Sequence, residues 1–464
     1  MLLYHYRSIE NAILEIEKGT FHFAPRKDLN DPLEGYIHVY WQGDKAAWEG
    51  LFRNYLCSLF NALEMYLLAA DKDLLYYRTL MPDIHKFDDV PIGKLYKNIG
   101  DVFLADTAVQ ALAGLYGKNR TKVQYDELRL ILQFVHSKAL NLCIETCVQH
   151  RIIPEEEGAK VLGRIKAEKH SGLLEKIYDS LSDANKEVQA VKYFKEVFED
   201  AVERQFVESG FEDEFFLYRN NDDKDITEES RQHRNWLAVA VDFPKIYIEQ
   251  MKESIYPEGF IVCFSGKNDD SAMWGNYADN HCGVCLIYET DKNQEIRIKM
   301  PEGFRSRKVK PVEYGGELLE RNFFESFGRL TISQIRSWLT GSEGISDCYK
   351  VFSDADKWRE EYWNAFETKN YRKLKEWEHE DEYRIAIDNL FGEYEDPESR
   401  NLQYDPRTLR GIIFGINTSE FEKKKIMEKL IAKKDVLEKF SFFQAEYDDI
   451  AQKIVIRPKR FWKL

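Results

Sequence analysis

The spacing of apolar residues changes twice along the chain, and this constrains the fold more than any other feature of the sequence. Short apolar segments typical of β-strands occur in residues 1–43 and again from residue 257 onwards. Between them, in residues 44–256, apolar side chains recur at the 3.6-residue spacing of amphipathic helices. We therefore predict an α+β fold in which residues 1–43 and 257–464 form one discontinuous domain, interrupted by a mainly helical insertion at 44–256.

The opening residues predict a compact strand-helix-strand unit. The first strand covers residues 2–7, and the helix covers residues 9–18 with Gly19 as its C-cap. A second strand covers residues 20–24. The segment RKDLNDPLEG that follows is rich in turn-forming residues, so we expect the chain to reverse there.

The rest of the chain predicts further helices and strands. In the insertion, residues 48–63, 128–143 and 191–202 have a clear helical period, and the acidic run at 212–230 predicts a surface loop or hinge. After the insertion we expect strands and helices in alternation. The predicted strands cover 259–265, 284–289, 295–300, 374–387, 411–415, 441–447 and 453–458, and the predicted helices lie within 318–368 and 419–434.

Composition restricts the environment and the partners. The 81 acidic and 66 basic residues give a net charge of −15, which disfavours nonspecific nucleic-acid binding but is compatible with a local basic groove. Seven cysteines, most of them within apolar patterns, predict reduced thiols. The start MLLYHYRS lacks the apolar core of a signal peptide, and the longest nearly uncharged apolar stretch, residues 56–70, is too short to span a bilayer. We expect a soluble, cytoplasmic protein without a membrane partner.

The segment LKEWEHEDEYRIAI, residues 374–387, has a glutamate at every second position from 376 to 382. As a strand, it would place all four carboxylates on one face. A solvated edge that blocks aggregation would explain Glu376 and Glu378. Glu380 and Glu382 directly precede an apolar run, and paired carboxylates with one partly buried can act as a base and a cation stabiliser. Glu380 and Glu382 are therefore our candidate catalytic residues.

Two side chains on the opening strand are candidates for ligand binding. His5 and Arg7 are two residues apart, so they share one face of the strand. Arginine binds phosphate through paired hydrogen bonds, and the two residues together could hold an anionic or ribose-bearing ligand. The pattern leaves open a surface edge with ordinary salt bridges.

The segment CFSGKNDDSAMWGNYADNHCGVC, residues 263–285, combines a strand end at Ser265 with a short predicted helix. Trp274 and Tyr277 are three residues apart and share a helical face, where they could form an aromatic wall for a planar ring or could pack the helix onto the sheet. His281, Cys282 and Cys285 resemble part of a metal site, but no second pair at a suitable spacing follows. We expect no metal.

Several catalytic and nucleotide-binding motifs are absent from the sequence. It contains no GxxxxGK[ST] loop and no GxGxxG between a strand and a helix, so phosphate cradles of those kinds are excluded. It also contains no GxSxG and no HExxH.

The order of several motifs resembles a prokaryotic family, the domain of unknown function 2971. The matching pieces are LYHYRS, NDPLEG, CFS, MWxxYAxxHxGV, WxxExEYRI and LRGIIFGxN, and they fall within residues 1–40 and 256–464. The helical insertion has no such match.

This family in turn is similar to ADP-ribosyltransferases, and the resemblance implies roles for single residues. It implies a split, mostly antiparallel sheet, with NAD as co-substrate. Arg7, with His5 as the histidine variant, would hold the phosphate or ribose, and Ser265 would be the serine of a central strand. Glu380 and Glu382 would be the Glu-x-Glu pair, with Glu382 on the ribose and Glu380 on the acceptor. The sequence departs from the Ser-Thr-Ser of that class, because it has Phe264-Ser265-Gly266.

Two functions follow as hypotheses. The first is an NAD-consuming ADP-ribosyltransferase or NAD glycohydrolase, acting on a protein, a nucleic acid, a small molecule or water, in the setting of a toxin or a phage-defence effector. In it, Trp274 or Tyr277 would stack on nicotinamide. The second is a non-catalytic ligand-sensing or partner-binding protein on the same fold, with the helical insertion as the surface for a protein partner.

Overall fold

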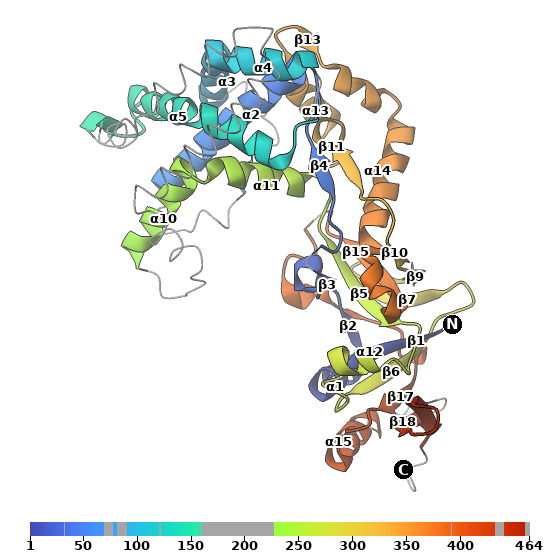
Figure 1. The fold of residues 1–464 in the computed structure, drawn as a ribbon. Coiled ribbons are helices and arrows are strands. Elements are labelled where there is room, and N and C mark those ends of the chain that lie inside the picture. The colour runs from blue at the N-terminus through green and yellow to red at the C-terminus, as the bar shows by residue number, and fades with distance from the viewer. Residues whose placement is uncertain are drawn as a thin grey trace. The chain divides into compact units, whose positions relative to one another are not determined.

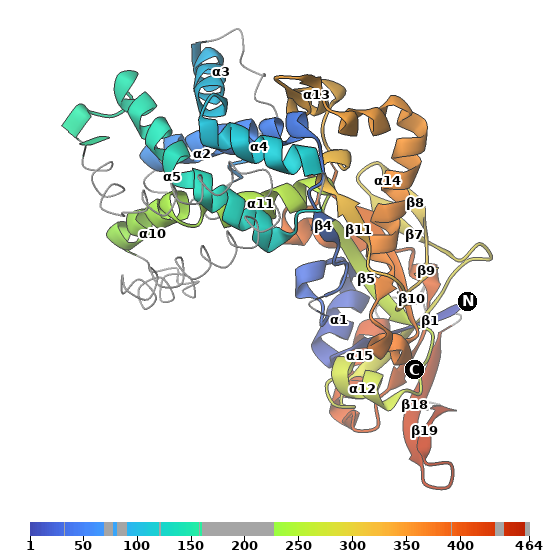
Figure 2. The same ribbon diagram turned by 45° about the horizontal axis from the view of Figure 1, so that its top comes forward.

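The chain forms two compact units, which are labelled by element in Figures 1 and 2. The sheet unit comprises Met1–Ile37, Pro257–Leu319 and Trp363–Leu464, and the helical unit comprises His38–Tyr256 and Glu320–Tyr362. The computed structural model describes residues 1–31, 33–68, 78–80, 91–119, 122–156, 158–159, 227–390, 392–431 and 440–459. The described residues mix helices with a mostly antiparallel sheet, so the predicted α+β class is confirmed at this level.

A nine-stranded sheet forms the centre of the sheet unit in the part of the chain that the structure describes. Its strands are β1 (Leu2–Arg7), β3 (Ala24–Pro25), β5 (Gly259–Ser265), β6 (Val284–Glu289), β9 (Lys310–Pro311), β15 (Glu382–Asp388), β17 (Leu409–Phe414), β18 (Ser441–Asp448) and β19 (Lys453–Pro458). They lie in the order β19-β18-β17-β6-β1-β5-β15-β9, and β3 also pairs with β5. The pairs are antiparallel except β17 with β18. The register places Ser265 opposite both Tyr4 and Glu382, so three distant segments meet in neighbouring strands.

The opening strand and helix follow the sequence prediction closely. β1 ends at Arg7, and α1 (Ile9–Lys18) begins after the N-cap Ser8, whose side chain accepts the N–H of Asn11. The helix ends at Gly19, whose φ of 64° is a conformation that glycine adopts without steric cost.

The two faces of the sheet pack against different helices. On one face, Leu3 of β1 lies in a buried core with apolar residues of α1 and of α15 (Glu420–Ile431). On the other face, Tyr6 packs with Met273 and Trp274 of α12 (Ser271–Tyr277). This alternation along β1 is the two-residue period of a strand buried on both sides.

Short strand pairs complete the sheet unit. They are β2 (Thr20–His22) with β16 (Asn401–Gln403), β7 (Glu295–Met300) with β8 (Gly303–Lys308), and β10 (Glu313–Tyr314) with β14 (Arg372–Lys373). The strands predicted at 259–265, 284–289 and 295–300 have the expected bounds, and those predicted near 411, 441 and 453 are β17, β18 and β19.

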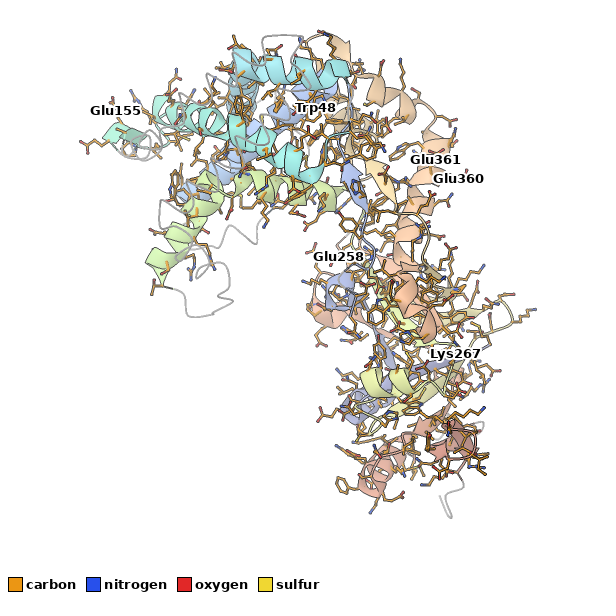
Figure 3. All side chains as sticks on the ribbon, in the orientation of Figure 1. Trp48, Glu155, Glu258, Lys267, Glu360 and Glu361 are labelled. Carbon is orange, nitrogen blue, oxygen red and sulfur yellow. The ribbon has the colours of Figure 1, made fainter. Side chains whose placement is uncertain are left out.

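The helical unit is built mainly from α-helices. They are α2 (Lys45–Leu68), α3 (Pro91–Leu104), α4 (Thr107–Asn119), α5 (Tyr125–Gln149), α10 (Glu228–Ala240), α11 (Phe243–Ile255) and α13 (Ile332–Trp338). Trp48 of α2 is fully buried among them, whereas Glu360 and Glu361 of α14 (Ala355–Asn370) are exposed (Figure 3). The helices predicted at 48–63 and 128–143 are α2 and α5; the one predicted at 191–202 and most of the acidic run at 212–230 lie outside the described residues.

Residues 320–362 join the helical unit, which the sequence did not indicate. β11 (Glu320–Asn322) pairs with β4 (His38–Tyr40), and β12 (Thr340–Gly341) pairs with β13 (Gly344–Ile345). The helix expected over 318–368 is therefore only partly correct, since α13 and α14 are separated by strands and turns.

Among the described helices, none is both long enough and apolar enough to cross a membrane.

Candidate functional site

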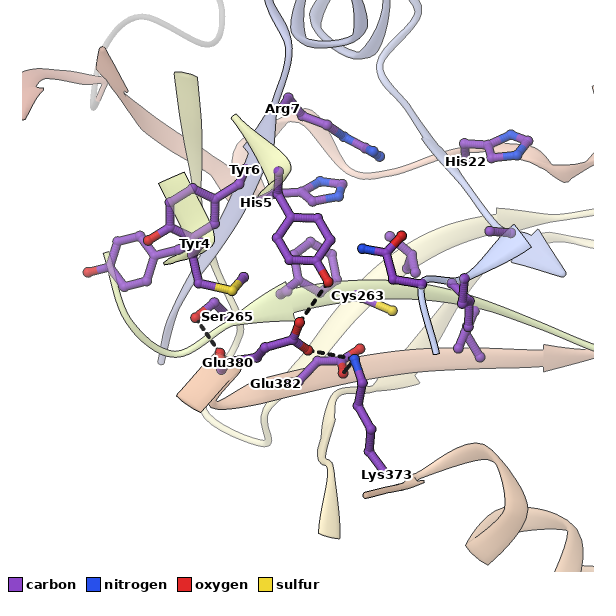
Figure 4. A pocket seen from close by; sticks show the side chains of 18 of the residues that line it. Tyr4, His5, Tyr6, Arg7, His22, Cys263, Ser265, Lys373, Glu380 and Glu382 are labelled. Atoms are coloured by element: carbon purple, nitrogen blue, oxygen red, sulfur yellow. Dashed lines mark hydrogen bonds and ion pairs between the residues drawn. The ribbon is translucent and has the colours of Figure 1, made fainter. Parts of the chain in front are cut away.

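A pocket of about 240 Å³ in the sheet unit is lined by side chains that are far apart in the sequence. Six of the seven candidate site residues line it, and they are His5, Arg7, Ser265, Tyr277, Glu380 and Glu382. In the view of Figure 4, His5 and Arg7 lie above the pocket, and Glu380, Glu382 and Lys373 lie below it. The neighbouring positions of β1, β5 and β15 in the sheet bring these residues together.

The glutamate row is not a strand, so the prediction that four carboxylates share one strand face is wrong. Residues Lys375–Glu380 form a 3-10 helix, and β15 begins only at Glu382. Asp381, between them, has a left-handed φ of 45°. The helix exposes Glu376 and Glu378 to solvent and turns Glu380 inward, which avoids the mutual repulsion of four aligned carboxylates.

Two donors fix the carboxylate of Glu380, which is buried and 2% exposed. The hydroxyl of Tyr277 donates to Oε1 at 2.6 Å, and Nζ of Lys373 donates to Oε2 at 2.6 Å (Figure 4). Burial and the neighbouring Glu380 raise the pKa of Tyr277, so its hydroxyl stays protonated and keeps donating. Because a carboxylate has about four acceptor positions, Glu380 retains capacity for a ligand hydroxyl.

The carboxylate of Glu382 is paired within the protein. Arg384 donates from Nε to Oε1 at 2.7 Å and from Nη2 to Oε2 at 2.8 Å, and Lys373 lies 3.3 Å from Oε2. Burial alone would raise the pKa of Glu382, but Arg384 and Lys373 hold it below its usual range. Glu382 is therefore ionised and its charge is largely balanced by Arg384.

Glu34 and Lys373 complete a buried group of five ionisable side chains with Glu380, Glu382 and Arg384, which we term the charge cluster. Glu34 contacts Arg384 and lies 3.9 Å from Lys373. Burial raises the pKa of Glu34 to about 7, and the negative charge of Glu382 adds to this shift, although Arg384 and Lys373 oppose it. The cluster has a net charge of −1 when Glu34 is ionised and none when it is protonated.

The sequence pattern did not identify Glu34 and Lys373 as site residues. Glu34 belongs to the NDPLEG segment, which indicated only a turn, and Lys373 precedes the glutamate row without a distinguishing pattern. Two signals were available: Glu34 lies inside NDPLEG, one of the pieces that match the family, and Lys373 lies four residues before the WxxExEYRI piece.

A buried carboxylate on α1 holds the two candidate residues of β1. Glu15 accepts from Arg7 Nε at 2.9 Å and lies 3.0 Å from His5 Nδ1, and the hydroxyl of Tyr288 donates to it at 2.6 Å. Burial would raise the pKa of Glu15, but His5 and Arg7 lower it to about 2. Burial and the charge of Arg7 lower the pKa of His5, which favours its neutral form. His5 and Arg7 are thus held in place by Glu15 and do not form a solvated strand edge.

Ser265 and Trp274 have mainly structural contacts. The hydroxyl of Ser265 donates to the carbonyl of Glu380 at 2.7 Å and accepts the N–H of Lys267 at 3.1 Å, so it shapes the turn that carries Glu380. Trp274 does not line the pocket, so of the two alternatives for Trp274 and Tyr277 the aromatic wall holds at most for Tyr277. Trp274 is fully buried, packs edge-on against Tyr6 of β1, and donates from Nε1 to the carbonyl of Asn268, so it packs the helix onto the sheet.

Gly266, which follows Ser265, lies against Asp381. Its N–H donates to the carbonyl of Asp381 at 2.7 Å, and a Cβ at this position would collide with the Asp381 carboxylate. In the described parts of the chain, no group of three His, Cys, Asp or Glu side chains is placed to hold a metal ion.

Comparison with known families identifies part of the chain. Residues 273–385 match the model of a family described as a protein of unknown function, DUF2971. Over these residues the chain is similar to the DUF2971 family. The DUF2971 match includes Tyr277, Lys373, Glu380, Glu382 and Arg384, whereas His5 and Arg7 lie outside it. No curated protein and no solved structure matches the chain.

Proposed function

We propose that the pocket binds NAD through its nicotinamide-ribose half and that the protein is an ADP-ribosyltransferase-like enzyme. The observation that carries this proposal is the meeting of His5, Arg7, Ser265, Tyr277, Glu380 and Glu382 at one pocket. These residues come from separate segments of the sequence. The resemblance to ADP-ribosyltransferases implies a role for each of them except Tyr277. Tyr277 was nominated from its spacing to Trp274 on a predicted helix. The setting of a toxin or phage-defence effector rests on the resemblance alone.

Glu380 is the carboxylate that we assign to the ribose. Its two donors, Tyr277 and Lys373, leave acceptor positions on both oxygens, whereas Arg384 occupies both oxygens of Glu382. Glu382 then serves to position Lys373 and to add negative charge. This reverses the roles that the resemblance implies for the two glutamates.

The proposed reaction breaks the bond between the ribose C1′ and the nicotinamide nitrogen, and the bonding electron pair leaves with nicotinamide. The sugar becomes cationic, and a fixed carboxylate stabilises that charge without having to reorganise. An acceptor oxygen or nitrogen then bonds to C1′ and loses its proton to solvent or to a carboxylate. Arg7, held through Nε by Glu15, would offer its Nη atoms to the phosphate.

Release of nicotinamide from NAD tests the proposal. We expect the wild-type protein to release it, and Glu380→Gln to reduce the rate by roughly 10²-fold, the scale of a positioned catalytic group. Glu382→Gln should reduce it comparably, but with a loss of thermal stability, because Arg384 loses its ionic partner. Glu378→Gln, an exposed carboxylate of the same 3-10 helix, is the matched control and should leave the rate unchanged. Equal rates in wild type and Glu380→Gln would remove Glu380 from the mechanism.

A second function is favoured by one observation, the internal pairing of Glu382. A carboxylate already neutralised by Arg384 suits a site that binds a ligand without cleaving it, as in a ligand-sensing or partner-binding protein. Calorimetric binding of NAD without nicotinamide release, or no binding at all, would support this function over the enzyme.

A further inference from the structure

The β7–β8 hairpin of the sheet unit has a charge opposite to that of the chain. From Lys292 to Lys310 the sequence contains seven lysines and arginines and two glutamates, whereas the whole chain has more acidic than basic residues. A strongly acidic protein repels phosphate at long range, so a polyanion can bind it only where cations are concentrated locally.

The pleat of the hairpin gathers three of these cations on its exposed face. Arg297 and Lys299 alternate with the buried Ile296 and Ile298 along β7, and Lys308 of β8 lies on the same exposed face. Successive cations on one strand face are about 7 Å apart, since a strand rises about 3.4 Å per residue. Figure 2 shows the hairpin as a ribbon labelled β7 and β8.

An exposed aromatic ring lies among the cations. Phe304 is 41% exposed, it is the cross-strand partner of Lys299, and the guanidinium of Arg297 lies 5.5 Å from its ring. Exposing a large apolar ring to water lowers solubility, so solubility does not explain why Phe304 is exposed among the cations. It matches surfaces on which a base stacks while cations contact the adjacent backbone.

The cations are weakly paired within the protein. Arg297 lies 3.9 Å from Asp405, and Arg305 lies 3.4 Å from Glu302 in an exposed pair, so both interactions are worth little. Among the described residues, Lys299 and Lys308 have no ion pair. Glu295, the cross-strand partner of Lys308, adds one carboxylate to this face, so cations outnumber it three to one. Protection of a sheet edge would need charge but not an exposed ring.

We propose that the exposed face of the β7–β8 hairpin binds single-stranded nucleic acid, with Arg297, Lys299 and Lys308 on phosphates and a base stacked on Phe304. The binding is independent of NAD cleavage, so it stands or fails separately from the proposed enzyme. If both hold, the hairpin would bring a nucleic acid to the protein that carries the site.

Fluorescence anisotropy of labelled 12-nucleotide single-stranded RNA and DNA, with the full chain at about 50 mM salt, tests this proposal. We expect measurable binding, and Arg297→Gln/Lys299→Gln/Lys308→Gln should weaken it roughly tenfold or more. The slope of log affinity against log salt should fall by about 2, the value for three lost phosphate contacts on a single strand. The control is Lys18→Gln/Lys424→Gln/Lys425→Gln, which removes the same charge from exposed positions of α1 and α15 and should retain binding.

Phe304→Ala distinguishes stacking from simple charge attraction. It should weaken binding to the single strand roughly fivefold or more and leave binding of a duplex or of heparin unchanged. The RNA and DNA probes show whether the 2′-hydroxyl contributes. Equal weakening by the two triple variants, no binding of the wild type, or tighter binding of an acidic peptide than of either nucleic acid would overturn the proposal.

Discussion

The two cations of the charge cluster, Lys373 and Arg384, each contact more than one carboxylate. Lys373 contacts Glu380 and Glu382, and Arg384 contacts Glu382 and Glu34. Sequence analysis could nominate Glu380 and Glu382 because they precede an apolar run. It could not assign their separate roles, because these depend on which cation each carboxylate contacts, and Glu34 comes from a segment more than 300 residues away.

Glu34 should make the stability of the protein depend on pH. Its pKa is raised to about 7 by burial, so the folded state binds a proton more tightly than the unfolded state. The resulting stabilisation is fully present below about pH 4.5 and is lost as pH rises through 7, and it amounts to at most about 3 kcal/mol. Urea unfolding at pH 5 and pH 8 measures the free energy of unfolding of Glu34→Gln and of wild type. The difference between the two proteins should shift in favour of Glu34→Gln by roughly 1–3 kcal/mol from pH 5 to pH 8.

Titrating groups outside the charge cluster affect both proteins equally. The difference between Glu34→Gln and wild type therefore reports the charge cluster, in which Glu34 has a pKa of about 7. Glu376→Gln, an exposed carboxylate of the 3-10 helix, is the control and should show no pH-dependent difference. A constant difference between Glu34→Gln and wild type across this range would show that Glu34 is ionised throughout.

Elements with a strong local pattern were predicted well, including β1 and β5 of the site, whereas the 3-10 helix that carries Glu380 was not. β1, β5, β6 and β7 combine apolar runs with clear turn signals, and α1 has both a regular isoleucine period and a glycine C-cap. The 3-10 helix at Lys375–Glu380 has a two-residue glutamate period that indicates a strand. That pattern is misleading because solvation of Glu376 and Glu378 and burial of Glu380 follow from tertiary contacts with Lys373 and Tyr277.

The left-handed conformation of Asp381 should be required to aim Glu380 into the pocket. Glycine and asparagine adopt a positive φ readily, whereas β-branched residues do not. We expect Asp381→Gly and Asp381→Asn to keep wild-type stability and nicotinamide release. Asp381→Val should lose about 1–2 kcal/mol of unfolding free energy and most of the release. Denaturant unfolding and the NAD assay measure the two effects, and an Asp381→Asn protein as impaired as Asp381→Val would show that the charge and not the backbone matters.

At the scale of the whole molecule, the chain leaves the sheet unit and returns to it twice. The first departure, at about residue 38, was predicted near residue 44 from the change of apolar period. The second, over residues 320–362, was not, because its short strands and helices differ little in composition from those of the sheet unit. Residues 320–362 are held in the helical unit by the pairing of β11 with β4. A pairing between segments so far apart cannot be inferred from one sequence.

All residues that line the pocket belong to the sheet unit, so NAD should protect that unit alone. Hydrogen-exchange mass spectrometry with saturating NAD should show slower exchange in peptides covering residues 4–7, 261–265 and 378–384. A bound ligand slows backbone opening in the region that it contacts. Exchange in peptides from α2 and α5, which belong to the helical unit, should therefore be unchanged. Arg7→Gln should reduce the protection by weakening the contact with phosphate. Protection centred on α2 or α5 would place the NAD site in the helical unit and contradict the assignment of the pocket.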